Sequence, residues 1–123
     1  MKHLFNFLFD QKRAQKSSLR SIEPKSQEHE VLLQLLVNYP EKVSVIDLVN
    51  STKSVSIGSV VSHVRCRLKS LGDDYSNPIK NIEQKAVSKY GNVCTHSYYQ
   101  LQPFAFNNAI KLEYEYRNCS NQN

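Results

Sequence analysis

The chain has 123 residues, of which 40% are hydrophobic and 22% charged, a composition that supports one compact domain and argues against wholesale disorder. Sixteen Lys and Arg residues outnumber eleven Asp and Glu residues, and the net charge of +5 favours polyanionic partners. Three widely spaced cysteines indicate reduced thiols rather than a disulfide framework, and no run reaches the roughly 20 apolar residues of a membrane span, so we expect a cytoplasmic protein without membrane contact.

Residues 1–25 are predicted to be an extension that precedes the domain. An apolar run at 4–9 is followed by a polar, basic stretch with the composition of a linker, and we place the domain boundary near Pro24. The apolar run favours packing on the domain or self-association over a membrane anchor, which would need a longer apolar face.

Three helices are expected between Ser26 and Gly72. Ser26 is a suitable N-cap for the first, which carries an apolar stripe at 31, 32, 35 and 36 and must end before Pro40. Ser44 is a suitable N-cap for a short second helix over 45–50, whose Ile46, Leu48 and Val49 should be buried. The third helix covers 56–71, where one narrow arc holds Ile57, Val60, Val61, Val64, Leu68 and Leu71.

Two extended runs, 79–88 and 93–102, flank a turn at 89–92 and predict a β-hairpin. Tyr99 and Leu101 on the returning strand are expected to close the core. The tail from 103 to 116 alternates like a strand at 110, 112, 114 and 116, but Phe106, Ile110 and Tyr114 also share one helical face. We favour the helix.

Together these elements predict an α+β, mainly helical fold. Three helices followed by a hairpin is the order of elements in a winged helix-turn-helix, a three-helix core with a β-hairpin wing. The domain is predicted at 26–102, between N- and C-terminal extensions at 1–25 and 103–123.

Four runs carry a resemblance to a known family: VLLQLL at 31–36, SVIDLV at 44–49, SIGSVVSHVRCRLKSLG at 56–72 and IEQKAVSKYGNVCTHSYYQL at 82–101. They resemble phage- and prophage-borne winged helix-turn-helix proteins, over a span of about three-fifths of the chain. The resemblance implies a DNA-binding fold and a regulatory role. The chain departs from the family at LKSLG, where the family tends to place arginine and another basic residue, and in its longer loop from 72 to 79.

The polar side of the third helix is the predicted DNA-reading face. Small hydroxyls at Ser59 and Ser62 would let the backbone approach base edges, and His63 or Arg65 would donate to guanine. Lys69 would contact phosphate. At the helix start, Ser56 would place its hydroxyl and the helix N-terminus against a phosphate oxygen.

The hairpin tip is the second predicted contact. Lys85, Lys89 and Asn92 would contact phosphates or the adjacent minor groove, and Tyr90 would stack against sugar. Each of these side chains, like those of the third helix, would otherwise be an ordinary solvated surface position.

No metal, cofactor or catalytic activity is expected. His63, Cys66, Cys94 and His96 are four potential zinc ligands, but their spacing matches no common zinc module. The chain has no P-loop, no G-x-S-x-G and no H-E-x-x-H motif.

The sequence therefore predicts a sequence-specific double-stranded DNA-binding protein, a transcriptional regulator or mobile-element accessory factor that acts as a homodimer. The alternative is a protein–protein interaction module whose terminal extensions bind a partner protein. The aromatic residues of the tail, which are expected in a core or a dimer interface, are Phe104, Phe106, Tyr114 and Tyr116.

Overall fold

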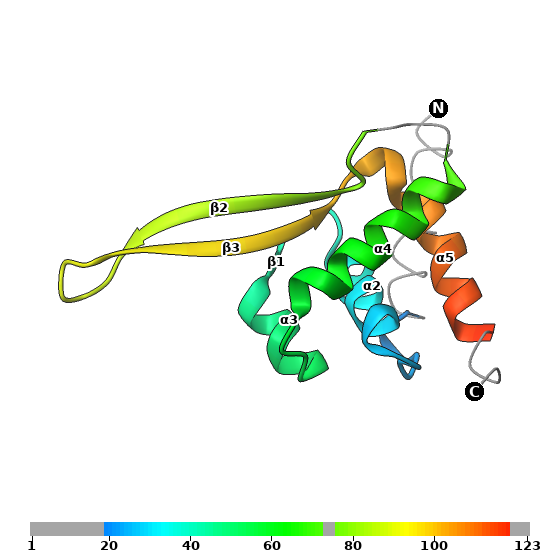
Figure 1. The fold of residues 1–123 in the computed structure, drawn as a ribbon, viewed down its shortest axis with the longest axis horizontal. Coiled ribbons are helices and arrows are strands. Elements are labelled where there is room, and N and C mark those ends of the chain that lie inside the picture. Colours follow the sequence, from blue (N-terminus) through cyan, green and yellow to red (C-terminus); the bar gives the residue numbers. More distant parts are fainter. Residues whose placement is uncertain (1–18, 73–75, 119–123) are drawn as a thin grey trace, which may run out of the picture.

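The computed structural model describes residues 19–72 and 76–118. They form an α+β arrangement with four α-helices and a three-stranded antiparallel sheet. In chain order the elements are α2 (Gln27–Asn38), β1 (Val43–Ser44), α3 (Val45–Thr52), α4 (Ile57–Leu71), β2 (Ile79–Val87), β3 (Val93–Leu101), a 3-10 turn η1 (Pro103–Ala105) and α5 (Phe106–Asn118). The β2–β3 hairpin projects from the helical body as a long arm (Figure 1).

The predicted caps begin the first two helices. The Ser26 hydroxyl accepts a hydrogen bond from the backbone N–H of His29 at 3.1 Å. The Ser44 hydroxyl accepts from the N–H groups of Ile46 and Asp47 at 3.1 and 3.4 Å. Side-chain oxygens thus satisfy donors that the first turn of a helix leaves unpaired. The helix α3 ends at Thr52, and the next residue, Lys53, adopts a left-handed conformation with φ 57°.

The prediction that Ile46 is buried is wrong. Its side chain is 60% exposed, and Leu48 is the buried residue of α3. With eight residues α3 has only two turns, so a single narrow side reaches the core and Ile46 lies outside it.

The core lies where α2 meets α3, α4 and α5. The predicted stripe of α2, at 31, 32, 35 and 36, is completely buried. Five of the six apolar residues of α4 are buried as predicted, and Leu71 packs against the core while partly exposed. Gly72 follows α4 in an extended conformation.

The strands pair in the order β1-β3-β2. Val43 pairs with Tyr99, and Ile79 pairs with Leu101. Tyr99 and Leu101 are buried, as predicted, so the inner ends of the hairpin belong to the core. Farther out most residues are exposed on both strands, and Gly91, with φ +84°, forms the turn.

The helix predicted in the tail is confirmed, but its place in the fold corrects the domain boundary. Four α5 residues, Phe106, Ala109, Leu112 and Tyr116, lie in the same buried cluster as α2 and α4. The segment 103–118 is therefore part of the domain rather than an extension. Leu19 is also buried in this cluster, so the domain begins before Ser26.

The predicted inner face of α5 is wrong in part, because Tyr114 is 61% exposed and Ile110 only partly buried.

None of the helices in 19–72 and 76–118 is both long and apolar enough to cross a membrane. The apolar run at 4–9, Cys119 and the last residues of the predicted tail lie outside the described residues.

Candidate nucleic-acid interface

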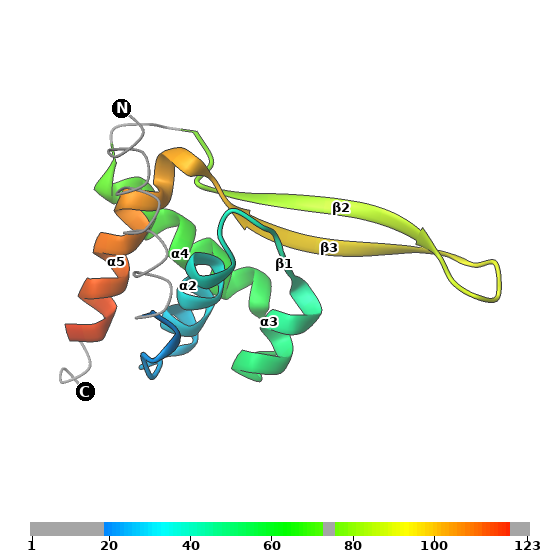
Figure 2. The same cartoon turned by 180° about the vertical axis from the view of Figure 1, so that it is seen from behind.

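The outer side of α4 is open to solvent. The helix α4 passes in front of α2 in Figure 1 and behind it in the reverse view of Figure 2. The side of α4 opposite α2 therefore faces away from the helical body. Of the residues predicted for this side all but Arg65 are exposed, as is Cys66: Ser56, Ser59, Ser62, His63 and Lys69. The division of α4 into a buried apolar side and a free polar side is confirmed.

Ser56 precedes α4 with its side chain uncommitted to a helix cap. Its carbonyl accepts from the N–H groups of Ser59 and Val60 at 3.0 and 3.2 Å, and its own N–H donates to the Ser54 hydroxyl at 3.1 Å. The backbone at the start of α4 is thereby fixed while the Ser56 hydroxyl remains exposed.

An open groove of about 380 Å³ lies between the first turns of α2 and α4. Hydroxyl groups line much of it, from Ser26, Ser54, Ser56 and Ser59, together with Glu28 and His63. Such a lining offers hydrogen bonds to a polar ligand with little steric obstruction.

His63 is linked to α2 by a side-chain hydrogen bond. Its Nδ1 lies 3.1 Å from Oε1 of Glu28, with the two side chains 67% and 29% exposed. An ionised carboxylate only accepts hydrogen bonds, so Nδ1 of His63 is the donor.

Arg65 does not lie on the reading face, which corrects its predicted role. Its side chain is half-buried, and one terminal nitrogen donates to the backbone carbonyl of Ile79 at 3.0 Å. Its Nε is buried with no hydrogen-bond partner among the described residues. The guanidinium therefore fastens α4 to the start of β2 and is turned away from the outer side.

The other two cations of α4, Arg67 and Lys69, differ in whether they contact another part of the fold. Arg67 lies 3.9 Å from a carboxylate oxygen of Glu115 and stacks over the Tyr116 ring at 4.8 Å, so it turns toward α5. Lys69 is exposed and makes no ion pair within the described segments. It is the α4 cation best placed to meet a phosphate.

The hairpin arm exposes Lys85, Lys89, Tyr90 and Asn92, as predicted. Its turn is closed by Ser88, whose hydroxyl accepts from the N–H groups of Tyr90 and Asn92 at 3.3 and 3.2 Å. The Lys89 ammonium lies 5.1 Å from the centre of the Tyr90 ring. Because the arm extends away from α4 (Figure 1), the predicted residues form two separate surfaces.

The four potential zinc ligands come from different elements, His63 and Cys66 from α4 and Cys94 and His96 from β3. Within residues 19–72 and 76–118 no three His, Cys, Asp or Glu side chains are grouped closely enough to hold a metal ion. Cys66 and Cys94 are free thiols on the surface.

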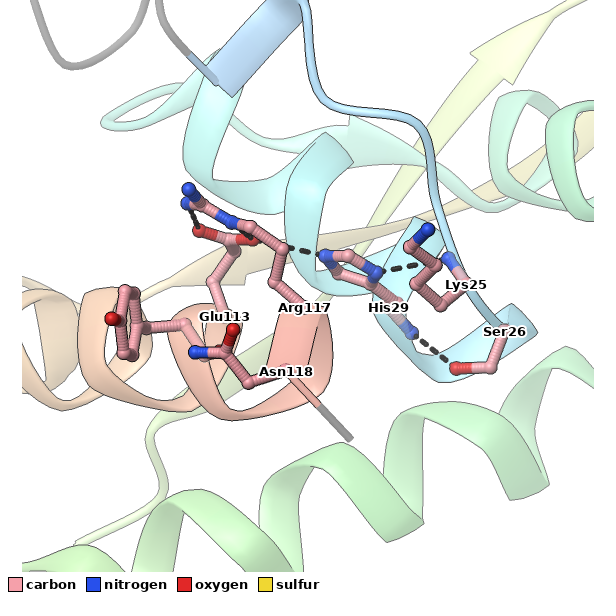
Figure 3. Close-up of polar contacts among 7 residues, drawn as sticks. Lys25, Ser26, His29, Glu113, Arg117 and Asn118 are labelled. Carbon is pink, nitrogen blue, oxygen red and sulfur yellow. Dashed lines mark hydrogen bonds and ion pairs between the residues drawn. The ribbon is translucent and has the colours of Figure 1, made fainter. Parts of the chain in front are cut away.

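A buried polar cluster joins α2 to α5, and the sequence analysis missed it (Figure 3). Nε2 of the buried His29 lies 3.0 Å from Oε2 of the buried Glu113, and the Lys25 N–H donates to Nδ1 of His29 at 3.0 Å. Arg117 donates to both carboxylate oxygens of Glu113. Since Nδ1 accepts, Nε2 of His29 carries the proton that it donates to Glu113.

The charge of Glu113 is stabilised despite burial. Burial alone raises the pKa of this carboxyl, but hydrogen bonds from Arg117 and His29 and the charge of Arg117 outweigh it and hold the pKa below its usual value. The Glu113–Arg117 spacing of four residues was visible in the sequence, whereas the partner His29 lies 84 positions away. The polar groups of the cluster bond to one another, and they hold α5 against α2.

No protein-family model matches the chain, and no curated protein matches it in sequence.

Proposed function

We propose that the protein binds double-stranded DNA as a winged helix-turn-helix, with the outer side of α4 in the major groove and the β2–β3 arm as the wing. The order of elements, three helices and then a hairpin, supports this, as does the short connection between α3 and α4. The two-residue strand β1 pairs with the edge of β3 that is opposite β2. The base of the hairpin therefore has a third strand.

The observation that carries the proposal is the two-sidedness of α4. Its inner side is buried apart from the partly exposed Leu71, while its outer side exposes small hydroxyls and Lys69, which forms no ion pair with any described residue. A groove about 12 Å wide admits a helix only if the side chains on its leading face are short or able to bond to bases and phosphates. The outer side of α4 meets that condition.

Each exposed residue has a distinct proposed role. Ser59 and Ser62 allow close approach to base edges, while Ser56 and the N-terminus of α4 receive a phosphate. Lys69 contacts a second phosphate. On the arm, Lys85 and Lys89 contact backbone phosphates, with Tyr90 and Asn92 against sugar or the minor groove. Arg65 contributes indirectly by holding the arm to α4.

Salt dependence of duplex binding tests this proposal. Fluorescence anisotropy with a labelled duplex should show affinity falling steeply between about 0.05 and 0.2 M salt, because bound phosphates release counterions. Lys69→Ala should lower the slope of log K against log salt by about 0.9. The matched control is Lys111→Ala, an exposed lysine of α5, which should leave the slope unchanged. Absence of binding, or binding insensitive to salt, would reject the proposal.

A protein-interaction module is the second candidate, favoured by apolar side chains at the end of the arm. Val87 and Val93, which pair across the hairpin, are 69% and 67% exposed, and Tyr90 is 79% exposed. The tail aromatics were expected in a core or a dimer interface. Phe106 and Tyr116 are buried in the core, which leaves Phe104 and Tyr114 exposed for a partner. Apolar docking of a partner protein would hardly respond to salt.

The proposed biological role is regulation of transcription or an accessory step of a mobile element, carried out by a homodimer. A two-fold dimer would place two α4 helices on half-sites about one helical turn of DNA apart. Analytical ultracentrifugation of the protein with and without duplex tests this stoichiometry, and one protein chain per duplex at saturation would contradict it.

A further inference from the structure

The contact between Glu28 and His63 links the groove to the reading face of α4. Glu28 lies in the first turn of α2, whereas His63 lies two turns into α4, so the contact crosses between helices. His63 is mostly exposed beyond that contact. Glu28 is also close to α5: burial raises the pKa of Tyr116, and the negative charge of Glu28 raises it further.

The contact fixes which nitrogen of His63 carries the proton. Because the carboxylate of Glu28 can only accept, Nδ1 of His63 bears hydrogen, and in the neutral ring Nε2 is then an acceptor. The two ring nitrogens point in nearly opposite directions, so the Nε2 lone pair is directed away from Glu28. The other charges near this site, Arg67 one turn along α4 and its partner Glu115 on α5, are engaged with each other.

This geometry alters the base that His63 can recognise. In the major groove guanine and thymine present only acceptors at O6, N7 and O4, apart from the thymine methyl group, and these would oppose the Nε2 lone pair. Adenine and cytosine present the exocyclic amino groups N6 and N4, which are donors. The role predicted from the sequence, in which His63 or Arg65 donates to guanine, does not suit His63 in this tautomer.

We infer, resting on the proposed function, that Glu28 is a positioning residue that holds His63 as an acceptor for the amino group of an adenine or cytosine. Glu28 itself touches no DNA in this arrangement. Its effect is on base preference at one position, through the tautomer and orientation of His63.

Selection of bound duplexes from a random library at about pH 8, where imidazole is neutral, tests the inference. The wild type should prefer adenine or cytosine at one position by about ten-fold, the size of one good base contact. His63→Ala and Glu28→Ala should both reduce the preference at that same position to about two-fold or less. The matched control is Glu30→Ala, which removes the same charge from the same turn of α2 but loses only a contact to Gln34, and it should keep the preference.

A measurement without DNA separates the positioning of His63 from DNA binding. The ¹⁵N chemical shifts of the His63 ring should show a protonated Nδ1 and a bare Nε2 in the wild type at about pH 8, and a shift toward the other tautomer in Glu28→Ala. Circular dichroism would confirm that the variant remains folded.

Two outcomes would overturn the inference alone: a guanine preference at the position that His63→Ala affects, or a preference unchanged in Glu28→Ala. A proton on Nε2 of the neutral wild-type ring would overturn it as well. Failure of the wild type to bind any duplex would instead overturn the proposed function, and with it the base preference, while the ring shifts would still report on the Glu28–His63 contact.

Discussion

Single polar contacts decide which cations of α4 are free to meet a ligand. Arg65, Arg67 and Lys69 lie within five residues of one another, yet Arg65 bonds to the Ile79 carbonyl and Arg67 turns to Glu115. Their positions on the helical wheel were predictable from the sequence. Their partners were not, because both lie on elements that only the tertiary fold brings close. The same holds for His63, whose partner Glu28 is 35 positions away.

Arg65→Ala should destabilise the fold by about 1–3 kcal/mol, because it removes a charged donor from the carbonyl of the buried Ile79. Arg67→Ala, at an exposed ion pair, should cost no more than about 1 kcal/mol. Urea unfolding followed by circular dichroism measures both. If Arg65→Ala left the stability unchanged but altered the base preference, Arg65 would instead contact DNA bases.

Glu113 should make stability depend on acid pH. Its pKa is lowered in the folded protein, so its ionised form stabilises the fold at pH above the ordinary value of 4.5, and this contribution is lost as the pH falls through the lowered pKa. The free energy of unfolding should therefore fall more steeply with acidification in the wild type than in Glu113→Gln. Glu115→Gln, an exposed carboxylate two residues on, should follow the wild type. Parallel curves for Glu113→Gln and wild type would contradict this account.

At the scale of elements, local signals predicted most of the secondary structure. Caps at Ser26 and Ser44 and the period of apolar residues in α4 placed three helices within two residues of their observed ends. The turn around Gly91 placed both long strands of the hairpin. Strand β1 was missed, because two residues carry no periodic pattern and their pairing with β3 is a long-range contact.

The arm should contribute to DNA affinity and little to base choice. Lys85→Ala combined with Lys89→Ala should lower the salt slope by about 1.8, since each lysine is assigned one phosphate contact. The sequence preference should stay unchanged, because phosphate contacts carry no base information. Anisotropy titrations and library selection on the same variant measure these two effects. A changed base preference with an unchanged salt slope would instead mean that the arm recognises bases.

At the scale of the whole molecule, the helix α5 completes the core around α2. Its buried residues and Leu19 share one cluster with the leucines of α2. The sequence showed that the tail could form a helix, but the boundary at 102 was placed too early. Whether an amphipathic helix packs on its own domain or on a partner depends on tertiary surfaces that no local pattern describes. Glu113 is a charged residue on the buried side of α5, so the pattern of apolar residues alone did not show which side faces the core.

Leu112→Ala should cost about 2–5 kcal/mol of stability, as expected for truncating a completely buried leucine. Tyr114→Ala, on the exposed side of the same helix, should change stability by no more than about 0.5 kcal/mol. Urea unfolding distinguishes the two. Similar costs for both would mean that α5 does not pack as described.

In the proposed complex the outer side of α4 and the end of the arm contact duplex DNA together. Backbone amide chemical shifts of ¹⁵N-labelled protein, recorded as duplex is added, would locate both contacts in one experiment. The largest changes should fall within 59–69 and 85–92, with α5 little affected. Changes confined to α5, or no change in either segment at saturating duplex, would contradict the proposed complex.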